Sequence, residues 1–133
     1  MKMISNDNYV DEAEHVIRKL KEKKNPKTGR DIPMVTTTKI RNLLAMTADI
    51  YNETLNVTGD RLPEELNNRI EYLRVRFTYE AGKDSEGKVR DFVTEAGLLD
   101  ILREIKGSRE NFMLFNRYME ALVAFHRFYG GKD

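Results

Sequence analysis

The stretch from Ser108 to Tyr129 carries apolar residues on most sides of the helix that its spacing predicts. One side of that helix carries Phe112, Phe115, Met119, Leu122 and Tyr129, and the adjacent side carries Leu114, Tyr118, Ala121, Phe125 and Phe128. The polar strip left over is narrow and consists of Asn116, Arg117, Glu120 and Arg127. A helix that is apolar over so much of its surface packs against several others. The chain is therefore predicted to form a helical bundle with its C-terminal helix near the centre.

The preceding residues also have helical spacing. They predict a helix over residues 8–22, a second helix that begins after a threonine cap at residues 36–38, and a third from Pro63 to a stop at Gly82. Residues 89–105 predict one helix, or two that meet near Gly97. The fold class is all-α: a single compact bundle of about five helices. It occupies residues 1–133, of which 1–35 contribute a helix and an exposed basic loop.

Composition excludes several classes of protein. The chain has no cysteine, which removes disulfide frameworks, thiolate zinc sites and cysteine nucleophiles. It also lacks a long apolar segment and the apolar region of a secretory signal, so we expect a cytoplasmic protein with no membrane partner. Because 23 basic residues oppose 22 acidic ones, a surface for a polyanion requires that charges of one sign gather on one face.

No constellation of catalytic residues is present in the sequence. The phosphate-binding, dinucleotide-binding, zinc-protease and serine-hydrolase motifs are all missing, so we predict no enzyme activity, no cofactor, no metal and no small-molecule substrate. His126 is predicted to be a partly buried structural histidine bonded through one ring nitrogen. One alternative is acid–base catalysis by His126 with His15, which requires the bundle to bring them together. Another is a di-iron site, but only one E-x-x-H motif, Glu12 to His15, is present.

The third predicted helix has a face of alternating cations and aromatics. Its members are Arg69, Tyr72, Arg76, Tyr79 and Lys83, at steps of three and four. Arginine and lysine neutralise phosphates, and tyrosine stacks on a base or bonds to a backbone oxygen, so this face suits a nucleic acid. The alternative is a solvated face on which the two tyrosines are half-buried against a neighbouring helix.

The start of the second helix, TTTKIRNLL, has similar chemistry. Free backbone N–H groups and threonine hydroxyls there could join Lys39 and Arg41 at a single phosphate. An ordinary threonine cap followed by exposed charges explains the same residues. The basic loop from Lys21 to Arg30 is a weaker candidate, because charged loops are usually only solvated.

Three stretches, TTTKIRNLL, EYLRVRFTYEAGK and NRYMEALVAFHRFYGGKD, together resemble one known family. This is the small α-helical subunit of the type III-A CRISPR interference complex, the Csm ribonucleoprotein. The likeness extends from about Thr36 onward and keeps the motifs in order. It implies a non-catalytic helical bundle, several copies of which stack along a guide RNA and its target RNA. The neighbours would be repeated backbone subunits and a large polymerase-like subunit.

The resemblance and the spacing together indicate the RNA-binding residues. These candidates are Lys39, Arg41, Arg69, Arg74, Arg76, Tyr79, Lys83 and Arg127. In two places the chain departs from the family pattern, because Lys83 stands where arginine is common and Phe125 where tyrosine is common. Lysine keeps the charge but loses the two-pronged phosphate contact of arginine. The alternative function is a protein-interaction module whose basic face binds acidic partner surfaces.

Overall fold

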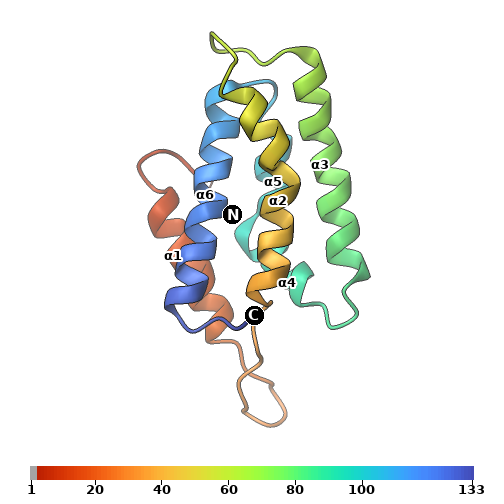
Figure 1. Cartoon of the computed structure of the whole chain (residues 1–133). Coiled ribbons are helices and arrows are strands. Elements are labelled where there is room, and N and C mark those ends of the chain that lie inside the picture. Colours follow the sequence, from red (N-terminus) through yellow and green to blue (C-terminus); the bar gives the residue numbers. More distant parts are fainter. Residues whose placement is uncertain (1–2) are drawn as a thin grey trace.

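The computed structural model describes residues 3–133, and within them it contains six α-helices and no β-strand (Figure 1). The helices are α1 (Tyr9–Lys21), α2 (Thr37–Thr54), α3 (Glu64–Lys83), α4 (Lys88–Ala96), α5 (Leu98–Arg103) and α6 (Arg109–Phe128). The all-α fold class is therefore confirmed, and of the two alternatives for residues 89–105 the structure has two helices. They meet at Gly97, where a left-handed backbone (φ 66°) separates α4 from α5.

The six helices enclose one hydrophobic core. Figure 1 shows α1, α6, α2 and α3 running along the long axis of the molecule, with α4 and α5 behind them. Helix α6 packs against α1 and α2, and α4 contacts both α3 and α1, so the bundle is closed. The buried residues form a single cluster that includes side chains from every helix.

Helix α6 supplies the largest part of this core. Phe112, Phe115, Tyr118, Met119 and Leu122 are each fully buried. The ring of Phe115 lies 6.2 Å from that of Phe112 and 6.3 Å from that of Phe77 on α3, within the range of aromatic pairing. The Tyr118 hydroxyl donates a hydrogen bond of 2.8 Å to the carbonyl of Ala96, a free acceptor at the end of α4.

Two expectations for α6 were wrong. Asn116, which we assigned to the polar strip, is buried; its side-chain amide donates to the carbonyl of Phe112 (2.9 Å) and its oxygen accepts from the hydroxyl of Thr47 on α2 (3.1 Å). Phe128, which we assigned to an apolar side, is 78% exposed. Apolar count alone does not reveal which side of a helix meets a polar partner, or which apolar residue of its last turn faces solvent.

Helix α3 extends further than the glycine signal predicted. Gly82 lies within the last turn and the helix ends at Lys83, with Asp84 as the C-cap in an extended conformation. Because the backbone of Gly82 is not left-handed, this glycine does not act as the stop. None of the helices among residues 3–133 is long and apolar enough to span a membrane.

Candidate nucleic-acid interface

The first turn of α2 is held by the C-terminal tail and by His126. The backbone N–H of Thr37 donates to the carbonyl of Lys132 (2.8 Å), and that of Lys39 donates to the hydroxyl of Thr36 (3.3 Å). The N–H groups of Thr37 and Lys39 are therefore not free for a phosphate, and that of Thr37 is taken by the distant C-terminal tail. The sequence gives no sign of this, because the partner comes from residues far along the chain.

His126 is fully buried and uses both ring nitrogens, one more than expected. Nε2 lies 2.7 Å from the carbonyl of Val35, and Nδ1 lies 3.1 Å from the hydroxyl of Thr37. A carbonyl only accepts, so Nε2 carries the proton and Nδ1 accepts from the threonine. Burial, and to a smaller extent the charge of Arg127, lower the pKa of His126. The neutral imidazole is a structural link between α6 and the start of α2.

His15 and His126 do not form a common site. His15 is exposed and lines a hollow between α1 and α4 together with Glu12 and Glu95, whereas both ring nitrogens of His126 are bonded beside α2. Among residues 3–133, no group of three or more histidine, aspartate or glutamate side chains could hold a metal ion.

Lys39 and Arg41 diverge on α2, so they do not meet at one phosphate. Residues two positions apart point to opposite sides of a helix. The Lys39 ammonium lies 3.1 Å from the carboxylate of Asp84, in the loop after α3. Arg41 is exposed on the other flank and makes no ion pair with any described residue.

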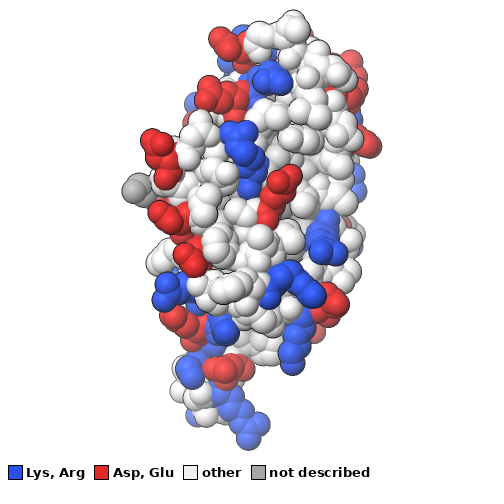
Figure 2. All heavy atoms as spheres, turned by 60° about the vertical axis from the view of Figure 1, so that its left-hand side comes forward, with Lys and Arg blue, Asp and Glu red and all other residues white. Residues whose placement is uncertain are grey.

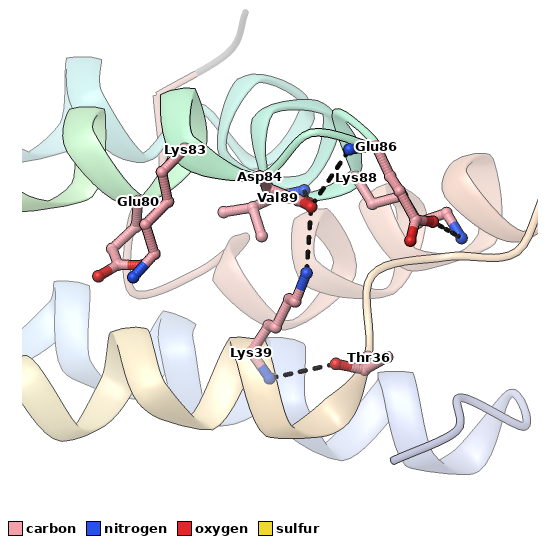
Figure 3. Close-up of polar contacts among 8 residues, drawn as sticks. All are labelled: Thr36, Lys39, Glu80, Lys83, Asp84, Glu86, Lys88 and Val89. Carbon is pink, nitrogen blue, oxygen red and sulfur yellow. Dashed lines mark hydrogen bonds and ion pairs between the residues drawn. The ribbon is translucent and has the colours of Figure 1, made fainter.

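Asp84 joins three elements of the fold (Figure 3). Its side chain is 5% exposed, accepts a hydrogen bond from the N–H of Val89 in the first turn of α4 (2.9 Å), and pairs with Lys39 of α2. The N–H of Val89 and the ammonium of Lys39 lower the pKa of Asp84, so this carboxylate remains charged. Sequence reasoning missed this residue, because Gly87 is the N-cap of α4 and Asp84 lies three residues before the usual capping position.

A pocket of about 410 Å³ lies between the start of α2 and the end of α3 and contains two of the candidate cations. Lys39 and Lys83 line it together with Glu80 and Asp84. The ammonium of Lys83 lies 3.0 Å from the carboxylate of Glu80 and 5.6 Å from the ring centre of Tyr79. The structure thus brings Lys39 and Lys83 together, each paired with an acidic side chain.

The cation–aromatic face of α3 is open to solvent. Tyr72 and Tyr79 are 61% and 65% exposed, so they are not half-buried against a neighbouring helix, although the face is solvated as that alternative also expected. Arg69 pairs with Glu53 of α2, while Arg76 makes no ion pair with any residue in the described part of the chain. We call Arg69, Tyr72, Arg76, Tyr79 and Lys83 the α3 stripe.

Two candidates lie away from this stripe. Arg74 is two positions from Arg76, pairs with Glu71 at 2.8 Å and borders a hollow that contains Leu99 of α5. Arg127 lies on α6, where it is exposed and pairs with Asp133 at 3.0 Å. The eight candidates therefore occupy several surfaces.

Comparisons with known proteins identify the family of this chain. A family model described as Csm2 Type III-A matches residues 8–132. A protein of Streptococcus thermophilus described as CRISPR system Cms protein Csm2 is 43% identical over 133 residues, covering 100% of both chains. Proteins of the same description are 42% identical in Mycobacterium tuberculosis (strain CDC 1551 / Oshkosh), covering 96% of this chain and 95% of the relative, and 36% identical in Enterococcus italicus, covering 71% and 68%. The resemblance found in the sequence is confirmed, and the chain belongs to the Csm2 family of type III-A CRISPR proteins.

Proposed function

We propose that this chain is a non-catalytic RNA-binding subunit of a type III-A CRISPR effector ribonucleoprotein in the cytoplasm. Several copies stack along the duplex of guide RNA and target RNA and contact its backbone without reading the sequence. The other partners are the repeated backbone subunits, the large polymerase-like subunit and neighbouring copies of the chain itself.

The α3 stripe is the observation that carries this proposal. Three cations lie along one exposed helix face, and two tyrosines stand between them with more than half of their surface in solvent. Aromatic side chains stabilise a fold when they are buried, whereas these two tyrosines expose apolar ring surface to solvent. An RNA strand supplies what this face lacks: phosphates for the cations and base or ribose surfaces for the rings.

The ion pairs made by the stripe are compatible with binding. Arg69 and Lys83 are 37% and 56% exposed at the side chain, and exposed pairs contribute only about 0–1 kcal/mol. A phosphate can therefore replace Glu53 or Glu80 at small cost. Arg76 has no ion-pair partner within residues 3–133, so it is the first residue to test.

Charge reversal on the stripe tests the proposal. Arg76→Glu with Lys83→Glu should weaken binding to RNAs of every sequence and make the slope of log affinity against log salt about 1.4 units shallower for single strands. The matched control is Arg103→Glu with Lys106→Glu, because these cations are 53% and 71% exposed and lie on α5 and in the loop after it. An equal loss in both variants, or a loss that depends on RNA sequence, would contradict the proposal.

Purification from the host tests the partners. The tagged protein should bring down short repeat-tagged guide RNAs together with larger CRISPR subunits at mild salt. Salt-sensitive protein partners without RNA would instead favour the interaction module. His126→Ala and His15→Ala variants that leave assembly and target cleavage intact would remove the remaining enzyme alternative.

A further inference from the structure

The net positive charge of the chain is concentrated in one short segment, which we call the basic hairpin (residues 21–31). It contains five basic residues, Lys21, Lys23, Lys24, Lys27 and Arg30, and two acidic ones, Glu22 and Asp31. The rest of the chain has 18 basic and 20 acidic residues, so its charge is slightly negative. Figure 2 shows the hairpin as a narrow basic projection below a body on which both charges mix.

The hairpin has a defined backbone. An isolated antiparallel bridge joins Lys24 to Asp31, and the N–H of Asn25 donates to the carbonyl of Arg30 at 2.8 Å. The side-chain oxygen of Asn25 accepts from the N–H of Lys27 at 2.8 Å, and Gly29 takes a left-handed conformation (φ 71°). These bonds involve no cationic side chain, so they order the tip and leave its charges available.

Some cations of the basic hairpin contact other residues of the chain, and others do not. Lys23 pairs with Asp91 of α4 at 2.8 Å, Lys24 pairs with Asp31 at 3.2 Å, and the ammonium of Lys21 lies 5.6 Å from the ring centre of Tyr129. Lys27 and Arg30, at the tip, make no ion pair with any residue of the described range 3–133. An ordered projection that ends in two free cations is complementary to an anion outside the chain.

The hairpin lies next to the candidate interface. It leads into Thr36 and the start of α2, where Lys39 is located, and Lys23 ties its base to α4. Asp84 accepts a hydrogen bond from the first turn of the same helix α4, beside the pocket that Lys39 and Lys83 line. A polyanion that follows the α3 stripe to this pocket therefore reaches the end of the bundle from which the hairpin projects (Figure 1).

We propose that the basic hairpin is a second RNA-contacting element, in which Lys27 and Arg30 bind backbone phosphates beyond the α3 stripe. This inference rests on the proposed RNA-binding function. A protein partner fits the hairpin less well, because protein interfaces centre on buried apolar or aromatic anchors. Residues 21–31 offer no aromatic or aliphatic side chain apart from Pro26, and all of them are exposed. Phosphate contacts require only cations and N–H groups.

The test uses the full chain and a single-stranded RNA of mixed sequence, titrated over a range of salt. Lys27→Glu with Arg30→Glu should reduce affinity about tenfold at low salt and make the salt slope about 1.4 units shallower. The variant should fold normally, because neither side chain makes a hydrogen bond or ion pair within the described chain. Arg103→Glu with Lys106→Glu is again the control of equal charge change.

Lysine acetylation provides a second readout that does not depend on any variant. Bound RNA should protect Lys27 of the wild-type chain from an acylating reagent and leave Lys106 reactive. If the hairpin variant keeps wild-type affinity and slope, or Lys27 stays reactive with RNA bound, the hairpin proposal fails, while a loss in the α3 stripe variant still supports the proposed function. If the wild-type chain binds no RNA even at low salt, both proposals fail.

Discussion

The backbone of Gly131 lies against the imidazole of His126, so closely that a Cβ built on this glycine would come within 2.1 Å of the ring. Its N–H also donates to the carbonyl of His126 at 2.7 Å. This contact holds the C-terminal tail over the start of α2, where Lys132 accepts from Thr37. Because the ring is buried and bonded at both nitrogens, it cannot move aside for a methyl group.

We therefore expect Gly131→Ala to lower the free energy of unfolding by about 1–3 kcal/mol, the usual cost of overpacking a core. Urea unfolding followed by circular dichroism measures this. Gly82→Ala is the matched control, because a Cβ there meets nothing within 4 Å and the position is helical. That variant should gain about 0.5–1 kcal/mol. Equal stability of the two variants would contradict the close packing at Gly131.

Stability should fall as the pH drops below the ordinary pKa of histidine, because His126 is held neutral. Burial lowers the pKa of His126 in the folded chain below the ordinary value of histidine, so the unfolded chain binds a proton first as the pH falls. The neutral His126 therefore contributes its full stabilisation above about pH 6.5. Below that pH the free energy of unfolding falls by at most about 1.4 kcal/mol per pH unit as this stabilisation is lost. Urea midpoints across this range check the expectation.

Two variants isolate the effect of His126. His126→Gln should be less stable throughout but should lack this part of the pH dependence. His15→Gln should retain it, because His15 is exposed. If the stability of His126→Gln depends on pH in the same way as that of the wild-type chain, groups other than His126 cause this dependence.

Most of the secondary structure could be predicted because each helix buries one side. The buried residues of α3, namely Leu66, Ile70, Leu73, Phe77 and Ala81, are those its periodicity indicates. The cap of α2 at Thr36 and the separation of α4 from α5 at Gly97 were within the predicted ranges. Gly82 misled because a glycine near the end of a helix can lie within the last turn as well as stop it, and here its backbone stays helical.

The site could be predicted less well because it depends on contacts between distant segments. The α3 stripe lies within one helix, so its spacing sufficed. The link between Lys39 and Asp84 spans 45 residues, and the capture of Thr37 by Lys132 spans most of the chain. Neither has a local signal. The sequence also does not show that Lys27 and Arg30 at the hairpin tip lack an ion-pair partner among the described residues, because composition does not reveal which cations are already paired.

The buried pair of Asn116 and Thr47 leads to a third prediction. Asn116→Asp keeps the shape of the side chain but places a carboxylate where the carbonyl of Phe112 now accepts from the amide. A buried charge without a counter-charge costs about 3–5 kcal/mol, so the variant should unfold at much lower urea even though the hydroxyl of Thr47 can still donate to it. Asn111→Asp, at an exposed position in the first turn of the same helix, should be neutral or slightly stabilising. Similar stability of both variants would contradict the burial of Asn116.

The pair of Asp84 and Lys39 leads to the last prediction, which concerns RNA affinity. Asp84→Asn retains an oxygen for the N–H of Val89 but removes the charge that holds the ammonium of Lys39. We expect stability to fall by about 1 kcal/mol, the net value of a typical hydrogen bond. RNA affinity should rise, with a salt slope about 0.7 units steeper for single strands, because Lys39 becomes available for one more phosphate.

Glu86→Gln separates this release from a general change in charge. Glu86 lies in the same loop and pairs with Lys88 at 2.8 Å, so its removal also adds one unit of positive charge and frees a lysine outside the candidate interface. If Asp84→Asn alone strengthens RNA binding, Asp84 restrains Lys39 in the unbound chain. If both substitutions strengthen binding equally, net charge explains the effect and Lys39 has no particular role.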